Sequence, residues 1–114
     1  MKPSSRKGKG RRLQNFLRDK IYDYFPSLME GDVKTAVMGE SGEDIILSPA
    51  ARDLIPFSFE CKNQERLNIW ESLSQSEDNS GNNTPAVVFK RNRTKTYIAL
   101  ELEEFLKLIG ETND

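Results

Sequence analysis

The chain has 114 residues, of which 36% are hydrophobic and 31% charged, and its formal net charge is −1 at pH 7. This composition is typical of one soluble globular domain, and no apolar stretch approaches the roughly 18 residues that a membrane span requires. The absence of histidine excludes Ser-His-Asp and Cys-His catalysis and metal sites built on imidazole. The single cysteine, Cys61, excludes an internal disulfide and predicts a reducing compartment such as the cytoplasm.

The first half of the chain predicts a helix followed by two strands. Residues 1–10 are small, polar and basic, which predicts a flexible arm in front of a single domain over 11–114. Apolar residues then recur with helical spacing up to Pro26. Ser48 and Pro49 are typical of a helix N-cap and first helical residue. The expected elements are a helix over 11–25, strands over 33–38 and 44–47, and a short helix over 50–54.

The second half predicts a central strand, a helix, a hairpin and a last helix. Asn63 suits an N-cap, and the helix after it is expected to bury Trp70, for which the core is favoured over a role in stacking on bases. The last helix is expected to turn Leu102, Phe105, Leu106 and Ile109 inward. The expected ranges are a strand over 57–62, a helix over 64–77, a hairpin over 85–100 and a helix over 101–109. This order indicates an α/β fold with a mixed sheet flanked by helices.

Acidic and basic side chains are placed together by the central strand. Side chains alternate along a strand, so Glu60 and Lys62 share one face while Phe59 and Cys61 share the other. Asp44 opens the preceding strand, and all three charged groups converge if the two strands are neighbours. Two carboxylates can bind a hard divalent cation, and a lysine beside them can orient a water molecule. The pattern is that of a hydrolytic site in outline.

Positive charge is concentrated in two segments although the net charge is near zero. Residues 1–12 contain six cations and no acid, and residues 90–95 contain four cations in one expected turn. Four cations in a tight turn repel one another, which favours an anionic partner for residues 90–95. For residues 1–12, a solvated tail is an alternative to contact with DNA. The candidate DNA contacts are Lys7, Lys9, Arg11, Arg12, Lys90, Arg91, Arg93 and Lys95.

Asp44 followed by Glu60, Cys61 and Lys62 resembles the PD-(D/E)xK motif of restriction-endonuclease-like nucleases. Segments 7–14, 48–52, 60–65 and 85–93 are similar to small phage-encoded endonucleases described as Holliday junction resolvase-like. The resemblance implies an αβββαβ core, a Mg²⁺ or Mn²⁺ cofactor and a homodimer acting on DNA, with no membrane partner. It implies that Asp44, Glu60 and the Cys61 carbonyl hold the metal and that Lys62 serves the attacking water.

Three further residues are candidates for the same site. Related nucleases place a glutamate on the first helix, and Gln14 stands at the comparable position here. Glu40 is an additional acid near the site, and Gln75 is a polar residue on the helix after the central strand. Gln75 is equally well explained as an ordinary exposed glutamine.

Several functions fit these observations. Resolution of a branched DNA junction is preferred, because no separate base-reading domain is present. A sequence-specific homing or restriction-type endonuclease is an alternative. The fold would also serve a non-catalytic nucleic-acid-binding module, or an adaptor whose basic segments contact an acidic protein.

Overall fold

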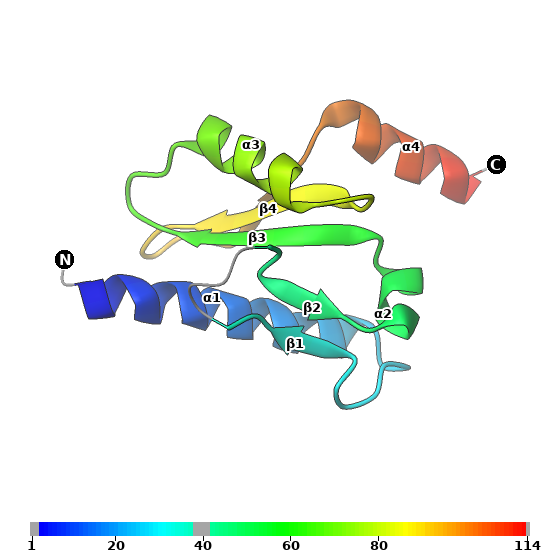
Figure 1. The fold of residues 1–114 in the computed structure, drawn as a ribbon, viewed down its shortest axis with the longest axis horizontal. Coiled ribbons are helices and arrows are strands. Elements are labelled where there is room, and N and C mark those ends of the chain that lie inside the picture. The colour runs from blue at the N-terminus through cyan, green and yellow to red at the C-terminus, as the bar shows by residue number, and fades with distance from the viewer. Residues whose placement is uncertain (1–2, 38–41, 114) are drawn as a thin grey trace.

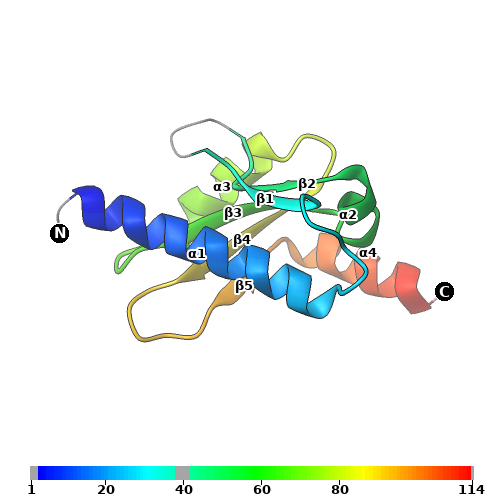
Figure 2. The same ribbon diagram turned by 90° about the horizontal axis from the view of Figure 1, so that it is seen from below.

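The computed structural model describes residues 3–37 and 42–113, which form a layer of strands with α1 on one side and α3 and α4 on the other (Figure 1). Seen from below, α1 crosses under the strands (Figure 2). The elements in chain order are α1 (Pro3–Tyr24), β1 (Val33–Thr35), β2 (Ile45–Leu47), α2 (Pro49–Leu54), β3 (Phe57–Asn63), α3 (Ile69–Asn79), β4 (Thr84–Lys90), β5 (Tyr97–Ala99) and α4 (Leu102–Asn113).

The strands form two small sheets that meet beside β3. Strands β1 and β2 are an antiparallel pair, while β3, β4 and β5 form a three-stranded sheet in which β3 and β4 are parallel and β4 and β5 antiparallel. The backbone N–H of Asp44 donates to the carbonyl of Phe59 at 2.8 Å and so connects the two sheets. The predicted mixed α/β class and the C-terminal hairpin are therefore confirmed.

The two faces of β3 have different chemistry. Phe59 and Cys61 belong to the hydrophobic core, together with Leu13 and Ile21 from α1. On the opposite face Glu60 is buried against α3, whose buried residues are the small polar side chains Ser72 and Ser76. The alternation predicted for this strand is thus present. Its consequence is that α1 packs on apolar side chains of β3, whereas α3 faces the polar Ser58 and Glu60 of β3 together with the apolar Val87 of β4.

Helix α1 begins earlier than the sequence predicts. Residues 3–10, expected to be a flexible arm, form its first turns. Proline is compatible with the first turn of a helix, and tertiary contacts stabilise the next turns although they contain two glycines. Asn63 donates its side-chain N–H to the carbonyl of Lys9 at 3.0 Å, and the Lys9 ammonium lies 3.5 Å from Glu65.

Helix α3 begins later than predicted. Strand β3 continues to Asn63, in register with Lys90, so Asn63 does not cap the helix. Asn68 caps it instead, because its Oδ1 accepts a hydrogen bond from the N–H of Glu71 at 3.1 Å. With this start, Ser72 and Ser76 face the sheet and the prediction that Trp70 is buried is wrong: Trp70 is 80% exposed.

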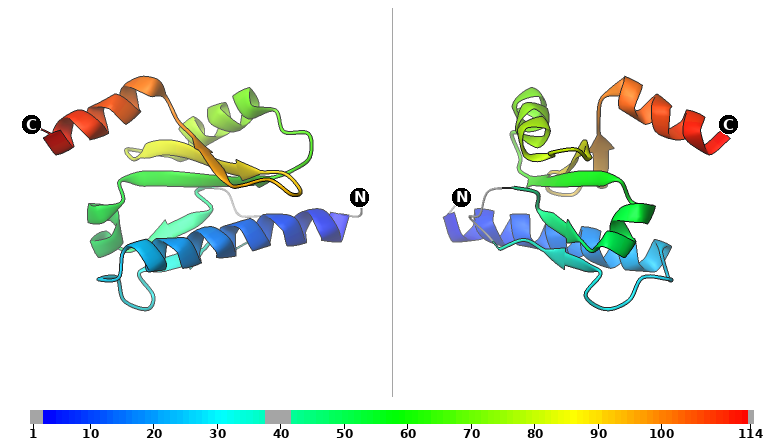
Figure 3. Two further views of the ribbon diagram at one scale, coloured as in Figure 1. Left: turned by 180° about the vertical axis from the view of Figure 1, so that it is seen from behind. Right: turned by 45° about the vertical axis from the view of Figure 1, so that its right-hand side comes forward.

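Helix α4 also departs from the expected packing. Its predicted inward stripe is exposed, with Leu102 at 67%, Phe105 at 46%, Leu106 at 53% and Ile109 at 42%. In both views of Figure 3, α4 runs outward from the body of the domain. The helical spacing was predicted correctly, but the prediction that these side chains turn inward is wrong.

The segment between β2 and β3 is held by Arg52. The Ser48 hydroxyl accepts from the Ala51 N–H at 3.1 Å, which confirms Ser48 as the N-cap of α2. From this helix Arg52 reaches Glu43 at 2.7 Å and also donates to the carbonyl of Phe57. Glu43 is therefore paired and half-buried, and its second oxygen has no hydrogen-bond partner.

We expect Arg52→Ala to lower the free energy of unfolding by about 2 kcal/mol, because it leaves the Glu43 carboxylate and the Phe57 carbonyl without their donor. Denaturant unfolding measures this value. Arg18→Ala is the matched control, since the Arg18–Asp19 pair is more exposed and is expected to be worth less than about 1 kcal/mol. Equal unfolding midpoints for the two variants would contradict the role given to Arg52.

Candidate functional site

A groove of about 820 Å³ collects most of the predicted site residues; we call it the site groove. It runs between the first turns of α1 and the C-terminal half of β3. It brings together Gln14, Asp44, Glu60, Cys61 and Lys62, which are separated in the sequence by up to 48 positions (62 − 14). The remaining lining residues are Arg6, Lys7, Lys9, Gly10, Val37, Asn63, Gln64, Glu65 and Arg66.

Asp44 is fixed at the edge of β3 by both its backbone and its side chain. Its Oδ2 accepts a hydrogen bond from the N–H of Cys61 at 2.7 Å. The N–H and C=O of one strand residue point to the same side, so the Cys61 carbonyl is also directed to the side of β3 on which Asp44 lies. Burial raises the pKa of Asp44 above its usual range, while the Cys61 N–H and the charge of Lys62 act to lower it.

Glu60 lies next to Asp44 and is 7% exposed. Its Oε1 accepts a hydrogen bond from the side-chain amide of Asn79 at 2.8 Å. Burial raises the pKa of Glu60, and the charge of Asp44 raises it further, whereas Asn79 and Lys62 lower it. Two adjacent carboxylates with raised pKa values repel each other when both are ionised. A positive ion between them would remove that repulsion.

The donor set suits a hard divalent cation. Mg²⁺ and Mn²⁺ prefer oxygen ligands, and the carboxylates of Asp44 and Glu60 together with the Cys61 carbonyl supply them. Asn63 also lines the site groove, and its buried Oδ1 has no hydrogen-bond partner. Within residues 3–37 and 42–113, no group of three or more histidine, cysteine, aspartate or glutamate side chains is placed so that it could hold a metal ion. The fit of this site to a divalent cation therefore rests on two carboxylates and backbone oxygen. Glu40, the additional acid predicted for the site, lies outside the described residues.

The Cys61 side chain takes no part in this chemistry. It is buried on the face of β3 that packs against α1. Burial raises the pKa of its thiol, and the charges of Asp44 and Glu60 raise it further. The thiol therefore stays protonated and is a poor nucleophile at neutral pH.

The accessory residues separate into two groups. Gln14 is buried in α1 and lines the site groove. Gln75 is exposed on α3 and does not line it. The polar contact from α3 comes instead from Asn79, which lies beyond the C-terminal end predicted for this helix. The sequence feature that could have predicted this contact is the spacing of Ser72, Ser76 and Asn79, which places three small polar residues on one face of the helix.

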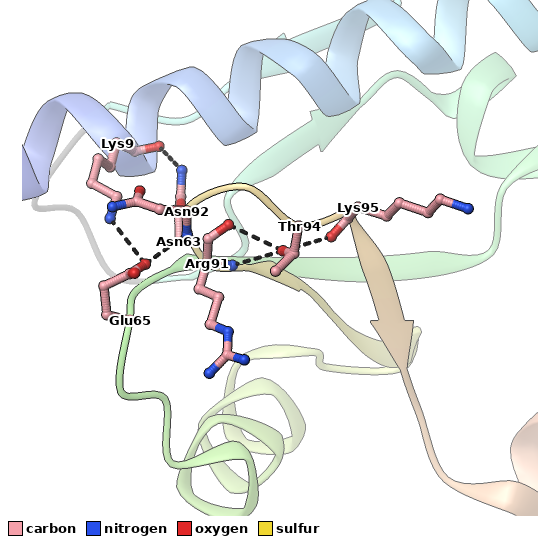
Figure 4. A network of polar contacts seen from close by, with 7 residues as sticks. All are labelled: Lys9, Asn63, Glu65, Arg91, Asn92, Thr94 and Lys95. Carbon is pink, nitrogen blue, oxygen red and sulfur yellow. Dashed lines mark hydrogen bonds and ion pairs between the residues drawn. The ribbon is translucent and has the colours of Figure 1, made fainter.

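The segment over 90–95, here called the basic turn, is tied to the rim of the site groove (Figure 4). Glu65 Oε2 accepts from the N–H of Asn92 at 2.6 Å and pairs with Lys9. The Thr94 hydroxyl closes the turn by accepting from the Arg91 N–H at 3.1 Å. These contacts hold α1, the segment after β3 and the basic turn together at one end of the molecule.

The candidate DNA contacts differ in their accessibility. Lys9 is 5% exposed and paired with Glu65, so it supports the groove wall and is not a free cation. The side chains of Arg91 and Lys95 point away from the hydrogen-bonded network in Figure 4. Lys90 is half-buried, and the exposed candidates are Lys7, Arg11, Arg12, Arg91, Arg93 and Lys95.

Comparisons with protein families, with curated proteins and with solved structures found no match. In the part of the chain that the structure describes, no helix has the length and apolar character needed to cross a membrane.

Proposed function

We propose that this protein is a divalent-metal-dependent endodeoxyribonuclease with a restriction-endonuclease-like active site. The observation that carries the proposal is the juxtaposition of Asp44, Glu60 and Lys62 in one groove whose rim is basic. The carboxylates are kept close together in a buried position that raises the pKa of each, which is unfavourable for a merely structural pair.

Each residue has a defined role in phosphodiester hydrolysis. Asp44, Glu60 and the Cys61 carbonyl would hold Mg²⁺ or Mn²⁺, and the bound ion would supply polarisation of the scissile phosphate and a lower pKa for the attacking water. Asp44 is oriented for binding by the Cys61 N–H, and Glu60 by the Asn79 amide. Lys62 orients the water and stabilises the negative charge that develops as the P–O bond breaks. The exposed cations around the groove contact the DNA backbone without reading sequence.

Two other interpretations are weaker. A non-catalytic binding module would use the basic residues but would have no need for two adjacent buried carboxylates. An adaptor for acidic proteins would be indifferent to divalent cations. A sequence-specific endonuclease would use the same chemistry, so only its substrate differs.

The experiment that tests the function compares a labelled four-way junction with a linear duplex of the same arm sequence, each in Mg²⁺, Mn²⁺ or EDTA. We expect metal-dependent cleavage of the junction. Cleavage of the duplex at one site would select the sequence-specific alternative. Salt-sensitive binding without cleavage of either DNA in any metal would contradict a nuclease.

The proposal includes a homodimer, and α4 supplies its interface. The exposed stripe Leu102, Phe105, Leu106 and Ile109 has the spacing of a helix that packs on another surface. The same stripe on a second copy is an apolar surface of the same kind, and packing of the two stripes would give a closed two-fold contact. A two-fold dimer also presents two active sites to the two strands of a branched DNA.

We expect the protein to sediment as a dimer and Leu106→Glu to convert it to a folded monomer, because a charge would be buried in the apolar contact. Analytical ultracentrifugation measures the mass. Leu54→Glu is the matched control, since Leu54 is 48% exposed on α2, away from α4. A wild-type monomer at all concentrations measured, or a dimer unaffected by Leu106→Glu, would contradict the assignment.

A further inference from the structure

Aromatic side chains stand on the elements that adjoin the C-terminal end of β3. Trp70, the single tryptophan of the chain, is 80% exposed in the first turn of α3, and Tyr97 on β5 is 55% exposed. Tyr97 packs against the half-buried Phe89, with ring centroids 6.1 Å apart. We call Trp70, Phe89 and Tyr97 the aromatic platform. Exposing large rings costs the free energy that burial would contribute, so two exposed rings at one end of a small domain call for an explanation.

Strand register places the aromatic pair beside the proposed active site. Lys62 is paired with Phe89, and Phe89 with Tyr97, across the three strands. Cross-strand partners share a face, so Phe89 and Tyr97 lie on the face that carries Glu60 and Lys62. The side chains of Lys62, Phe89 and Tyr97 therefore form a row across the three strands, from the proposed catalytic lysine to the exposed ring of Tyr97.

Helix α3 brings Trp70 to the same end. The C-terminal part of α3 lies over the middle of the strands, where Asn79 contacts Glu60 and the Ser76 hydroxyl donates to the Ala86 carbonyl at 3.4 Å. Its first turn follows directly after the segment that leaves the C-terminal end of β3 (Figure 1). That segment includes Arg66, which lines the site groove four residues before Trp70.

Cations lie on the segments next to these aromatic residues in the chain or in the sheet. Lys62 and Arg66 line the site groove, and Arg91 and Lys95 project from the basic turn that connects β4 to β5. Aromatic rings interleaved with cations bind single-stranded nucleic acid, because the rings stack on bases while the cations contact phosphates. A regular duplex keeps its bases stacked inside the helix, so no base is free to stack on these aromatic side chains.

We propose that the aromatic platform stacks on unpaired bases, so that the substrate is DNA with a single-stranded or opened segment next to the scissile phosphate. This inference rests on the proposed nuclease function and defines its substrate class. In it, Trp70 and Tyr97 hold one or two bases out of the duplex while Lys62 and the carboxylates face the adjacent phosphodiester. Strand ends, flaps and opened junctions satisfy this requirement, and uninterrupted duplex does not.

The test is a binding measurement in EDTA, where cleavage is absent, with the emission of Trp70 as the readout. The protein is titrated with a short oligothymidylate and with an abasic oligomer of the same length and charge. We expect oligothymidylate to quench the emission and to bind about tenfold more tightly than the abasic oligomer. Trp70→Ala and Tyr97→Ala, measured by anisotropy of labelled DNA, should each weaken oligothymidylate binding about tenfold and leave abasic binding unchanged.

Two control variants separate stacking from general damage. Trp70→Phe keeps a ring and should retain most of the affinity, and Tyr24→Ala removes a 78% exposed ring at the far end of α1 and should have no effect. Equal affinity for the two oligomers, or full affinity in both platform variants, would overturn the inference while leaving metal-dependent cleavage untouched. No binding of either oligomer at low salt would overturn the DNA-binding function itself.

Discussion

Glu60→Gln is expected to stabilise the metal-free protein at pH 8 and to abolish cleavage. Burial and Asp44 raise the pKa of Glu60 in the folded state above its ordinary value of 4.5. A carboxyl whose folded pKa is raised contributes stability below its unfolded pKa and loses that contribution as the pH rises through the folded pKa. Glutamine keeps an oxygen for the Asn79 amide and carries no charge. The variant should therefore gain stability at pH 8 and almost none at pH 4.

Thermal unfolding in EDTA at pH 4 and pH 8 measures this effect. We expect the free energy of unfolding of Glu60→Gln to exceed that of wild type by about 1 kcal/mol at pH 8, which corresponds to about 4 °C in Tm. Glu65→Gln is the matched control in the same groove. The pKa of Glu65 is lowered, chiefly by the Asn92 N–H, so its stabilising contribution is present above its unfolded pKa and the control variant should lose stability at pH 8. The same sign for both variants would refute the electrostatic description of Glu60.

Metal binding should reverse the order of thermal stability of wild type and Glu60→Gln. A cation that binds only the folded protein raises its Tm. In wild type the cation would also neutralise two carboxylates, Asp44 and Glu60, so the rise in Tm should be larger than in Glu60→Gln, which has one. Adding Mg²⁺ at pH 8 should raise the Tm of wild type and leave that of Glu60→Gln nearly unchanged. The cleavage rate should fall at least about 100-fold in the variant, because a ligand has been removed.

Lys62→Ala is expected to lower the single-turnover cleavage rate by about 10²–10³-fold, the effect of removing one donor that stabilises transition-state charge. DNA affinity should change little, because the proposed function gives the phosphate contacts mainly to the exposed cations of α1 and the basic turn. Single-turnover kinetics at saturating protein separate the two effects.

Lys34→Ala is the matched control for Lys62→Ala. Lys34 is an exposed lysine on β1 and does not line the site groove. Its removal should leave the rate within a factor of two or three. If Lys62→Ala cleaves at the wild-type rate while remaining folded, then the active site lies elsewhere or Lys62 has only a structural role.

Local signals in the sequence predicted the elements whose formation depends on neighbours in the chain. The Ser48 cap and the alternation of β3 are of this kind, and both are present. The helical stripe of α1 is present in part: Leu13 and Ile21 are in the core with Leu17 and Phe25 against it, but Phe16 and Tyr24, which the same period includes, are exposed. The convergence of Asp44 with Glu60 also followed from pattern, because a carboxylate at a strand start and another within the next strand reach each other when the strands are adjacent.

The features that were missed depend on tertiary contacts. Strand β3 ends at Asn63, only one residue later than predicted, but α3 starts at Ile69, where Asn68 caps it; Ser72 and Ser76 are then buried and Trp70 is exposed. Lys9 was predicted as a phosphate contact, yet Glu65 lies beside it only because the segment after β3 folds back to α1. The exposed stripe of α4 has a clear helical period, but periodicity does not say which molecule provides the partner.

Metal-dependent strand cleavage tests the central claim most directly. One sample of wild-type protein bound to a branched DNA with an unpaired segment is held in EDTA, then given excess Mg²⁺, with Glu60→Gln treated in parallel. The proposed site predicts no product in EDTA, rapid cleavage after Mg²⁺ is added and no cleavage by the variant. Equal product in EDTA and Mg²⁺, or equal cleavage by Glu60→Gln, would contradict a metal-dependent nuclease built on Asp44, Glu60 and Lys62.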